Sequence, residues 1–209
     1  MAKLIKKIVY TGKIVLLTGL HIGGSNLAMN IGGPDNFVVR NPLNNLPYIP
    51  GSSLKGKLRS LCELYNGEVG ADRGPSKNPK GKSGALFGTS ADDKTGHASR
   101  LIVRDAELDL ANKDDFKNCD MPYTESKTEV NINRITSEAK PRTFERVPAG
   151  AKFNYEIILN IFEGENEKDL QDTLKQSKAL LEDDYLGGNG SRGYGKIKFE
   201  EEKTEEKKY

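Results

Sequence analysis

The sequence predicts an α+β protein with a ferredoxin-like core, in which strands and helices follow the order β-α-β-β-α-β. Two segments, 53–65 and 166–182, carry hydrophobic side chains at helical spacing. Each lies between segments of β-branched and apolar residues that are typical of strands. Two β-α-β units in a chain of 209 residues indicate a single domain with insertions.

The first half begins with a strand over 8–18, along which alternate side chains share a face. One face would hold Ile8, Tyr10, Ile14, Leu16, Leu20 and Ile22. If the strand continues, His21 points to the opposite side. A glycine-rich loop follows and ends in the Gly-Gly-Pro-Asp turn of 32–35, and residues 37–39 are a candidate for a short strand.

The turn at 50–53 contains proline, glycine and serine, which predicts a serine N-cap for the helix over 53–65. Residues 66–98 are polar and rich in glycine, as expected of an insertion. The segment 100–110 contains the second strand. The alternation over 128–147 predicts a long hairpin that turns at 137–141.

The second half ends with a strand over 153–162, the helix over 166–182 and a last strand over 196–199. Gly187 and Gly188 end the helix, as glycine often does. The mixed charges from residue 200 onward predict a flexible tail. An antiparallel sheet of this RRM-like shape can leave one face free for a ligand, as in RNA-binding sheets.

Composition excludes several classes of protein. The chain has no run of about 18 apolar residues that could cross a membrane, and its start does not resemble a secretion signal. Cys62 and Cys119 are too few for a disulfide framework, so a cytoplasmic location is expected. With His21 and His97 they lack metal-ligand spacing, and would hold zinc only if folding gathered them.

Basic residues gather near the start of the chain. The first 60 residues contain eight Lys or Arg and a single acid, Asp35, whereas the net charge of the whole chain is only +2. This asymmetry favours contact with a polyanion. A solvated, lysine-rich surface explains it equally well.

The segment 51–59 could bind phosphate, because a helix N-terminus offers free N–H groups and partial positive charge. Lys55 and Arg59 are four residues apart and would share a helix face. Gly56 costs about 1 kcal/mol inside a helix, which suggests that something approaches the backbone there. The alternative is an ordinary capped helix with solvated lysines.

A second glycine-rich segment, 187–196, contains the pattern G-x-G-x-x-G. A helix precedes it and a strand follows, which is the wrong context for a dinucleotide site. Ile197 replaces the hydroxyl residue of a phosphate-binding loop, which excludes that motif too. The segment 192–199 approaches an aromatic RNA-recognition signature. We therefore expect an ordered loop that lets an RNA backbone come close to Arg192, rather than a flexible connector.

Four motifs occur in an order that resembles a known family. They are TGLHIGG at 18–24, LPYIPGSSLKGK at 46–57, the arginine-containing segments of 133–147, and DYLGGNGSRG at 184–193. They resemble the RAMP superfamily, and within it the repeated backbone subunits of the type III-A CRISPR effector, the Csm complex. The resemblance covers about residues 7 to 200 and weakens across 66–98 and in the tail.

The resemblance implies that several copies stack along a CRISPR guide RNA in a filament that pairs with complementary target RNA. The other Csm complex subunits, including the large polymerase-like subunit, are implied partners, and no membrane is involved. Residues 66–98 would form a lid-like insertion. Residues 111–150 would form a thumb hairpin that opens the guide–target duplex at regular steps.

The resemblance also implies site residues. Asp35 would be catalytic and would bind a divalent metal ion, Mg²⁺, and the products would be a 2′,3′-cyclic phosphate and a 5′-hydroxyl. Without the resemblance, the simpler interpretation of Asp35 is a turn-forming residue. The implied RNA-binding residues are His21, Gly23, Gly24, Ser52, Ser53, Lys55, Lys57, Arg59, Arg134, Arg142, Gly187, Gly188, Gly190, Ser191, Arg192 and Gly193.

Two other functions stay open at this point. The chain could be a non-catalytic RNA-binding scaffold in which Asp35 is only a turn residue. It could also be a stand-alone endonuclease that processes guide RNA, usually with a histidine. The presence of only two histidines and the long hairpin argue against the endonuclease.

Overall fold

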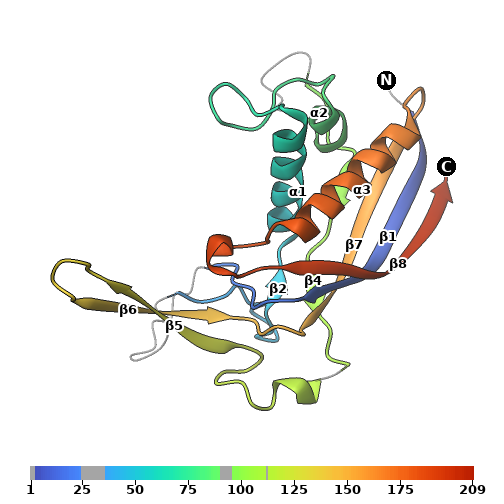
Figure 1. The fold of residues 1–209 in the computed structure, drawn as a ribbon. Helices are drawn as coiled ribbons and strands as arrows, with labels where there is room; N and C mark the ends of the chain where they lie inside the picture. The colour runs from blue at the N-terminus through green and yellow to red at the C-terminus, as the bar shows by residue number, and fades with distance from the viewer. Residues whose placement is uncertain (1–2, 25–35, 90–95, 112) are drawn as a thin grey trace.

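The computed structural model describes residues 3–24, 36–89, 96–111 and 113–209. One mixed α/β body carries a six-stranded antiparallel sheet, and a separate two-stranded hairpin projects from it (Figure 1). The strand order is β2-β4-β7-β1-β8, and β3 also pairs with β7. The strands of this sheet are β1 (Leu4–Leu16), β2 (Tyr48–Ile49), β3 (Leu101–Val103), β4 (Ala106–Leu108), β7 (Lys152–Phe162) and β8 (Ile197–Lys208).

Three helices lie together on one side of the sheet: α1 (Gly51–Asn66), α2 (Lys82–Phe87) and α3 (Glu167–Asp183) (Figure 1). The two predicted helices are confirmed, and Leu54 and Leu58 of α1 and Leu170, Leu174 and Leu181 of α3 are buried. Tyr65, at the end of α1, is exposed. The core contains, among others, Ile14 and Leu16 of β1, Phe153 and Leu159 of β7, Leu54 and Leu58 of α1, and Leu174 and Leu181 of α3. Burial of this apolar surface is the main force that holds helices and sheet together.

β1 occupies the middle of the sheet, between β7 and β8. Its register with β7 runs from Leu4↔Phe162 to Val15↔Lys152. Its register with β8 runs from Lys6↔Lys208 to Leu16↔Ile197. The last strand is therefore much longer than the sequence predicts, and the tail expected to be flexible is paired with β1.

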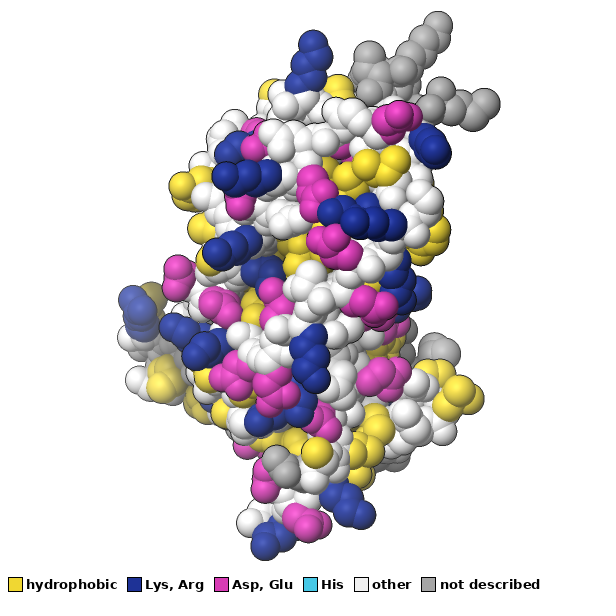
Figure 2. Space-filling view, turned by 90° about the vertical axis from the view of Figure 1, so that its right-hand side faces the viewer, with side chains coloured by type: hydrophobic (Ala, Val, Ile, Leu, Met, Phe, Trp, Pro, Cys, Tyr) yellow, Lys and Arg dark blue, Asp and Glu magenta, His cyan; other side chains and the backbone are white. Residues whose placement is uncertain are grey.

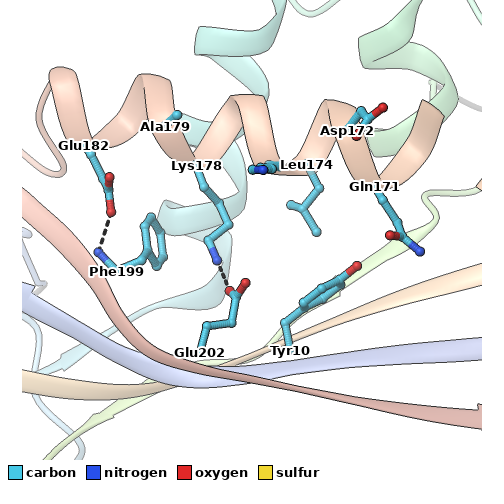
Figure 3. Close-up of a pocket in the computed structure, with 10 residues that line it drawn as sticks. Tyr10, Gln171, Asp172, Leu174, Lys178, Ala179, Glu182, Phe199 and Glu202 are labelled. Carbon is cyan, nitrogen blue, oxygen red and sulfur yellow. Dashed lines mark hydrogen bonds and ion pairs between the residues drawn. The ribbon is translucent and has the colours of Figure 1, made fainter. Parts of the chain in front are cut away.

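Side-chain contacts explain why a run of charged residues is ordered. Lys178 of α3 forms an ion pair with Glu202 (Figure 3). Glu202 also accepts a hydrogen bond of 2.5 Å from the hydroxyl of Tyr155. The ammonium of Lys178 lies 4.5 Å from the ring centroid of Phe199. Of the charged residues that line the groove between α3 and β8 in Figure 3, Lys178, Glu182 and Glu202 already have partners within the chain.

The pairing of β1 with β8 also changes the meaning of the charge asymmetry. Lys6 pairs with Glu167 and Glu206, and Lys13 pairs with Asp109 and Glu201. On the face seen in Figure 2, basic and acidic side chains are accordingly interspersed. Folding neutralises part of the basic cluster that the first 60 residues suggested.

The polar segment 66–98 contains a helix, α2, which packs against α1 and α3. Leu86 and Phe87 are buried there. Glu68 fixes the start of α2, since its carboxylate accepts hydrogen bonds from the backbone N–H groups of Lys82 and Ser83. This segment is therefore partly core, although its composition indicates only a solvated insertion.

The hairpin consists of β5 (Glu125–Ile132) and β6 (Ala139–Arg146). Its turn lies earlier than predicted, at 133–138, because the side chain of Asn133 accepts hydrogen bonds from the backbone N–H groups of Ile135 and Thr136. The strand expected at 37–39 is replaced by isolated bridges, such as Gly23↔Val38. Within the described part of the chain, no helix is long and apolar enough to span a membrane.

Candidate nucleic-acid interface

The N-terminus of α1 is already occupied by a carboxylate of the chain itself. The side chain of Asp105 accepts a hydrogen bond of 2.7 Å from the backbone N–H of Gly51. The N-cap residue is Pro50, and no side chain of its own caps the helix, so the predicted serine cap is wrong. Asp105 could not be identified as the capping residue because it lies 54 positions further along the chain.

The three basic residues of α1 all have partners within the chain. The Lys55 ammonium donates to the carbonyl of Leu101 at 3.1 Å, and burial lowers its pKa. Arg59 pairs with the buried Glu63 at 2.7 Å. Lys57 pairs with Asp184 at 2.8 Å. Arg59 also donates a hydrogen bond to the carbonyl of Ser76 at 2.9 Å, so all three cations tie α1 to other segments and none of them is simply solvated.

The open part of this helix surface is made by small residues. Ser52 is exposed, and Gly56 lies one turn later on the same face. A Cβ atom built on Gly56 would meet no heavy atom within 4 Å. Nothing within the described chain requires glycine there, so the open backbone is available to a ligand.

The glycine loop, defined here as residues 187–195, is ordered by its own hydrogen bonds. The N–H of Leu186 donates to the carbonyl of Gly195 at 2.8 Å. Gly187 has φ +78° and a Cβ there would lie 2.4 Å from the carbonyl oxygen of His21, so glycine is required. Gly190 is required for another reason, since its Cβ would lie 2.0 Å from the ring of Tyr185. Gly188, Ser191, Arg192 and Gly193 are exposed.

His21 joins three segments. It is only 9% exposed, and its Nδ1 atom lies 2.7 Å from the carbonyl oxygen of Glu145 in β6. Its own carbonyl accepts a hydrogen bond from the N–H of Gly188. Its ring packs edge-on against Phe144. His21 is buried at a joint, whereas alternation along the strand predicts that it points away from the core.

Glu145 anchors the base of the hairpin. Its buried carboxylate accepts hydrogen bonds from Arg40 at 2.6 Å, Thr124 at 2.7 Å and the backbone N–H of Val38 at 2.8 Å. Its backbone N–H donates to the carbonyl of Asn36. The structure therefore fixes 36–40 against the hairpin. Asp35 itself lies outside the described residues.

The hairpin and the glycine loop meet across a groove of ≈ 390 Å³, called the hairpin groove below. Arg192 reaches Glu129 of β5 at 3.2 Å. Arg142 lies opposite Glu129 in the register of the two strands, and Arg134 is in the turn; both are exposed. The groove is lined by Glu129, Val130, Asn131, Lys140, Arg142, Phe144 and Arg192.

The roles of several residues that build this region could not be predicted from the sequence. Tyr185 stacks against the ammonium of Lys57, which lies 3.8 Å from the ring centroid. Arg40, Glu129 and Glu145 form ion pairs with residues far away in the sequence. No local spacing could reveal such pairs.

Metal ligands do not cluster in the described part of the chain. There is no group there of three or more His, Cys, Asp and Glu side chains that could hold a metal ion. Cys62 and Cys119 are free thiols, and burial raises the pKa of each.

Known proteins resemble this chain along nearly all of its length. The family model of the RAMP superfamily matches residues 13–198. The CRISPR system Cms endoribonuclease Csm3 of Streptococcus thermophilus is 46% identical over 203 residues, covering 95% of this chain and 89% of that protein. The protein of the same name from Methanothermobacter thermautotrophicus is 43% identical over 216 residues, covering 97% and 87%.

Two solved structures have the same fold. The crystal structure of a Csm3-Csm4 subcomplex in the type III-A CRISPR-Cas interference complex gives a TM-score of 0.60 at 30% identity, covering 99% of this chain and 82% of that one. Methanopyrus kandleri Csm3 gives 0.62 at 23% identity, covering 93% and 75%, which supports the fold alone. From the family match and the identity to these endoribonucleases, the chain belongs to the RAMP superfamily and, within it, to the Csm3 family of CRISPR proteins.

Proposed function

We propose that this chain is the guide RNA-binding backbone subunit of a type III-A CRISPR antiviral ribonucleoprotein, and an endoribonuclease that cleaves complementary target RNA at regular intervals. One observation carries the proposal beyond the similarity itself: folding gathers the four sequence motifs into one place. His21 of the first motif contacts Gly188 of the fourth and Glu145 of the third. Lys57 of the second motif pairs with Asp184 of the fourth.

The proposed RNA interface combines open backbone with exposed cations. Ser52 and Gly56 leave the backbone of α1 accessible, and Gly188 and Gly193 do the same in the glycine loop. Backbone N–H groups and arginine side chains are common phosphate ligands in RNA-binding proteins. The remaining members of the interface are His21, Gly23, Gly24, Ser53, Lys55, Lys57, Arg59, Arg134, Arg142, Gly187, Gly190, Ser191 and Arg192.

The internal partners of Lys55, Lys57 and Arg59 assign them a double role in this proposal. Lys55 ties α1 to β3, Lys57 ties it to Asp184 at the end of α3, and Arg59 pairs with Glu63 within α1. All three contribute positive potential toward the guide backbone. Sequence specificity then comes from pairing between guide and target, and not from this chain.

We assign the chemistry to Asp35, with a divalent metal ion, Mg²⁺. The assignment rests on the family resemblance of the first glycine-rich loop. A nucleotide turned out of the duplex frees its ribose, so that the 2′-hydroxyl can line up with the adjacent phosphate; such orientation can lower a barrier by several kcal/mol. A bound divalent ion would stabilise the negative charge that develops on the phosphate. Asp35 would either hold that ion or orient the hydroxyl.

Finer features of the architecture belong to the same proposal. The core is ferredoxin-like, supported by the strand order β8-β1-β7-β3/β4 with α1 and α3 on one side. Residues 66–98 act as a lid and 111–150 as a thumb in the cytoplasmic complex. Its partners are guide RNA, target RNA, further copies of this chain in a filament and the other Csm subunits, including the large polymerase-like one.

The test is target RNA cleavage by the assembled complex with wild-type chain, Asp35→Ala and Asp172→Ala. Asp172 is a matched control, because it is an exposed aspartate on α3. We expect evenly spaced cuts from wild type and control in magnesium, none in chelator, and normal RNA binding without cuts from Asp35→Ala. Equal cutting by all three would show that Asp35 is a turn residue. Binding without cutting by all three would make the chain a scaffold.

A further inference from the structure

The contact between the glycine loop and the hairpin contains a carboxylate between two cations. Nη1 of Arg192 lies 3.2 Å from Oε2 of Glu129, and Nζ of Lys127 lies 3.7 Å from Oε1. The Glu129 side chain is 19% exposed, whereas that of Arg192 is 59% exposed. The carboxylate is thus mostly covered, and the guanidinium that it holds is open to solvent.

The buried ring of Tyr194 holds two of the cations near Glu129, namely Lys127 and Arg146. Tyr194 is 1% exposed, and its ring centroid lies 4.6 Å from Nζ of Lys127 and 5.0 Å from Cζ of Arg146. Its hydroxyl has no hydrogen-bond partner among the described residues. Burial and the nearby Glu129 carboxylate raise its pKa to about 12, so the phenol stays neutral. Lys127 and Arg146 are therefore anchored on the ring, while Arg192 is mostly exposed and is held by Glu129.

Glu129 is also the single acid among the residues that line the hairpin groove, where Lys140, Arg142 and Arg192 supply positive charge. A carboxylate and a phosphate offer an arginine the same charge-assisted hydrogen bonds. Because the Arg192 guanidinium is largely open to solvent, its pair with Glu129 contributes little free energy, so another anion can displace the carboxylate.

We propose that Glu129 is an internal substitute for an RNA phosphate, which holds Arg192 in the RNA-free chain and releases it when RNA fills the hairpin groove. The inference rests on the proposed RNA binding and adds a specificity device to it. RNA that does not reach the groove cannot displace Glu129, and so it lacks the Arg192 contact. Glu129 thereby weakens binding to polyanions that are not seated along the hairpin.

Replacing Glu129 by glutamine removes the competing charge and keeps the shape of the side chain. From the typical strength of such pairs, we expect about two- to fivefold tighter RNA binding. Part of any gain is the general effect of one less negative charge. Glu138→Gln controls for that effect, because Glu138 lies on the same hairpin and also pairs with a lysine, Lys140 at 3.7 Å.

The experiment is fluorescence anisotropy of a labelled single-stranded RNA with the full-length chain. The proteins are wild type, E129Q, E138Q, R192Q and the double variant E129Q/R192Q, each checked for folding by thermal denaturation. The double-mutant cycle separates a direct pair from independent effects. We expect E129Q to bind more tightly than E138Q, and the gain to vanish in the R192Q background.

Two outcomes would overturn the inference alone. Either E129Q and E138Q bind equally well, or the gain from E129Q persists without Arg192, while the wild-type chain still binds RNA. A third outcome, in which none of the five proteins binds RNA, would overturn the proposed RNA binding and the inference together.

Discussion

The carboxylate of Asp105 accepts a hydrogen bond of 2.7 Å from the backbone N–H of Gly51, and so closes the N-terminus of α1 with a residue from the β3–β4 connection. A carboxylate at this end of a helix satisfies a free N–H group and interacts favourably with the partial positive charge of the helix dipole. Asp105 thus ties the start of α1 to the sheet.

Removing this carboxylate should destabilise the protein. We expect Asp105→Ala to lower the free energy of unfolding by about 1 kcal/mol, as loss of a helix cap does. Asp105→Asn should retain part of the stabilisation, because the amide oxygen can still accept the hydrogen bond from Gly51. Urea denaturation measures both, and an unchanged midpoint for Asp105→Ala would show that the contact contributes nothing.

Gly56→Ala separates folding from RNA binding. The substitution meets open space and improves helix propensity, so we expect the free energy of unfolding to rise by about 1 kcal/mol. If RNA packs against this backbone, affinity measured by anisotropy should fall at the same time. Ser60→Ala, one turn later and also exposed, is the control and should change RNA binding little. Unchanged affinity in Gly56→Ala would place the RNA elsewhere.

The ion pair of Lys178 and Glu202 predicts a pH dependence. Burial alone would raise the pKa of Glu202, but hydrogen bonds from Lys178 and Tyr155 hold it below its ordinary value of 4.5. A lowered carboxyl pKa stabilises the folded state at higher pH, and this contribution is lost as pH falls from about 4.5 through the folded pKa.

Glu202→Gln should therefore lower stability at pH 7 by about 1 kcal/mol, a modest value because Glu202 is partly exposed and screened by solvent. Below the folded pKa the difference from wild type should shrink. Urea denaturation at pH 7 and pH 3 provides the comparison. A constant difference at both pH values would rule out the ionised carboxylate as its source.

Arg40 and Glu145 predict the largest loss of stability. Glu145 is 1% exposed, so Arg40→Met leaves a buried carboxylate without its cation, which typically costs about 3–5 kcal/mol. The double variant Arg40→Met/Glu145→Gln should recover part of that loss, since no buried charge remains. Thermal denaturation tests both variants. If the double variant is as unstable as Arg40→Met, hydrogen bonding rather than charge dominates.

Local patterns predicted the elements but not the contacts between them. The spacing of Leu54 and Leu58 identified α1, because a helix buries every third or fourth residue regardless of its partner. The acidic and basic residues after Phe199 gave no such periodicity. Their order depends on β1 and on Lys178, which lie elsewhere in the sequence.

In the candidate site, too, the local motifs could be predicted and the long-range contacts could not. The glycine motifs were recognisable because their spacing is local. The burial of His21, and the pairing of Lys57 with Asp184, come from tertiary packing that one sequence does not encode in any short window. Arg192 was expected near RNA phosphate, but its present partner, Glu129, lies 63 positions away.

The central position of β1 has a consequence for biosynthesis. β1 needs both β7 and β8 as neighbours, and of the strands in this sheet these two lie furthest along the chain from it. Pairings between such distant segments form slowly, and they leave hydrophobic surface uncovered during translation. Ile8, Ile14 and Leu16 therefore stay uncovered from the time β1 emerges until β7 and β8 follow, so a chaperone would be useful throughout that interval.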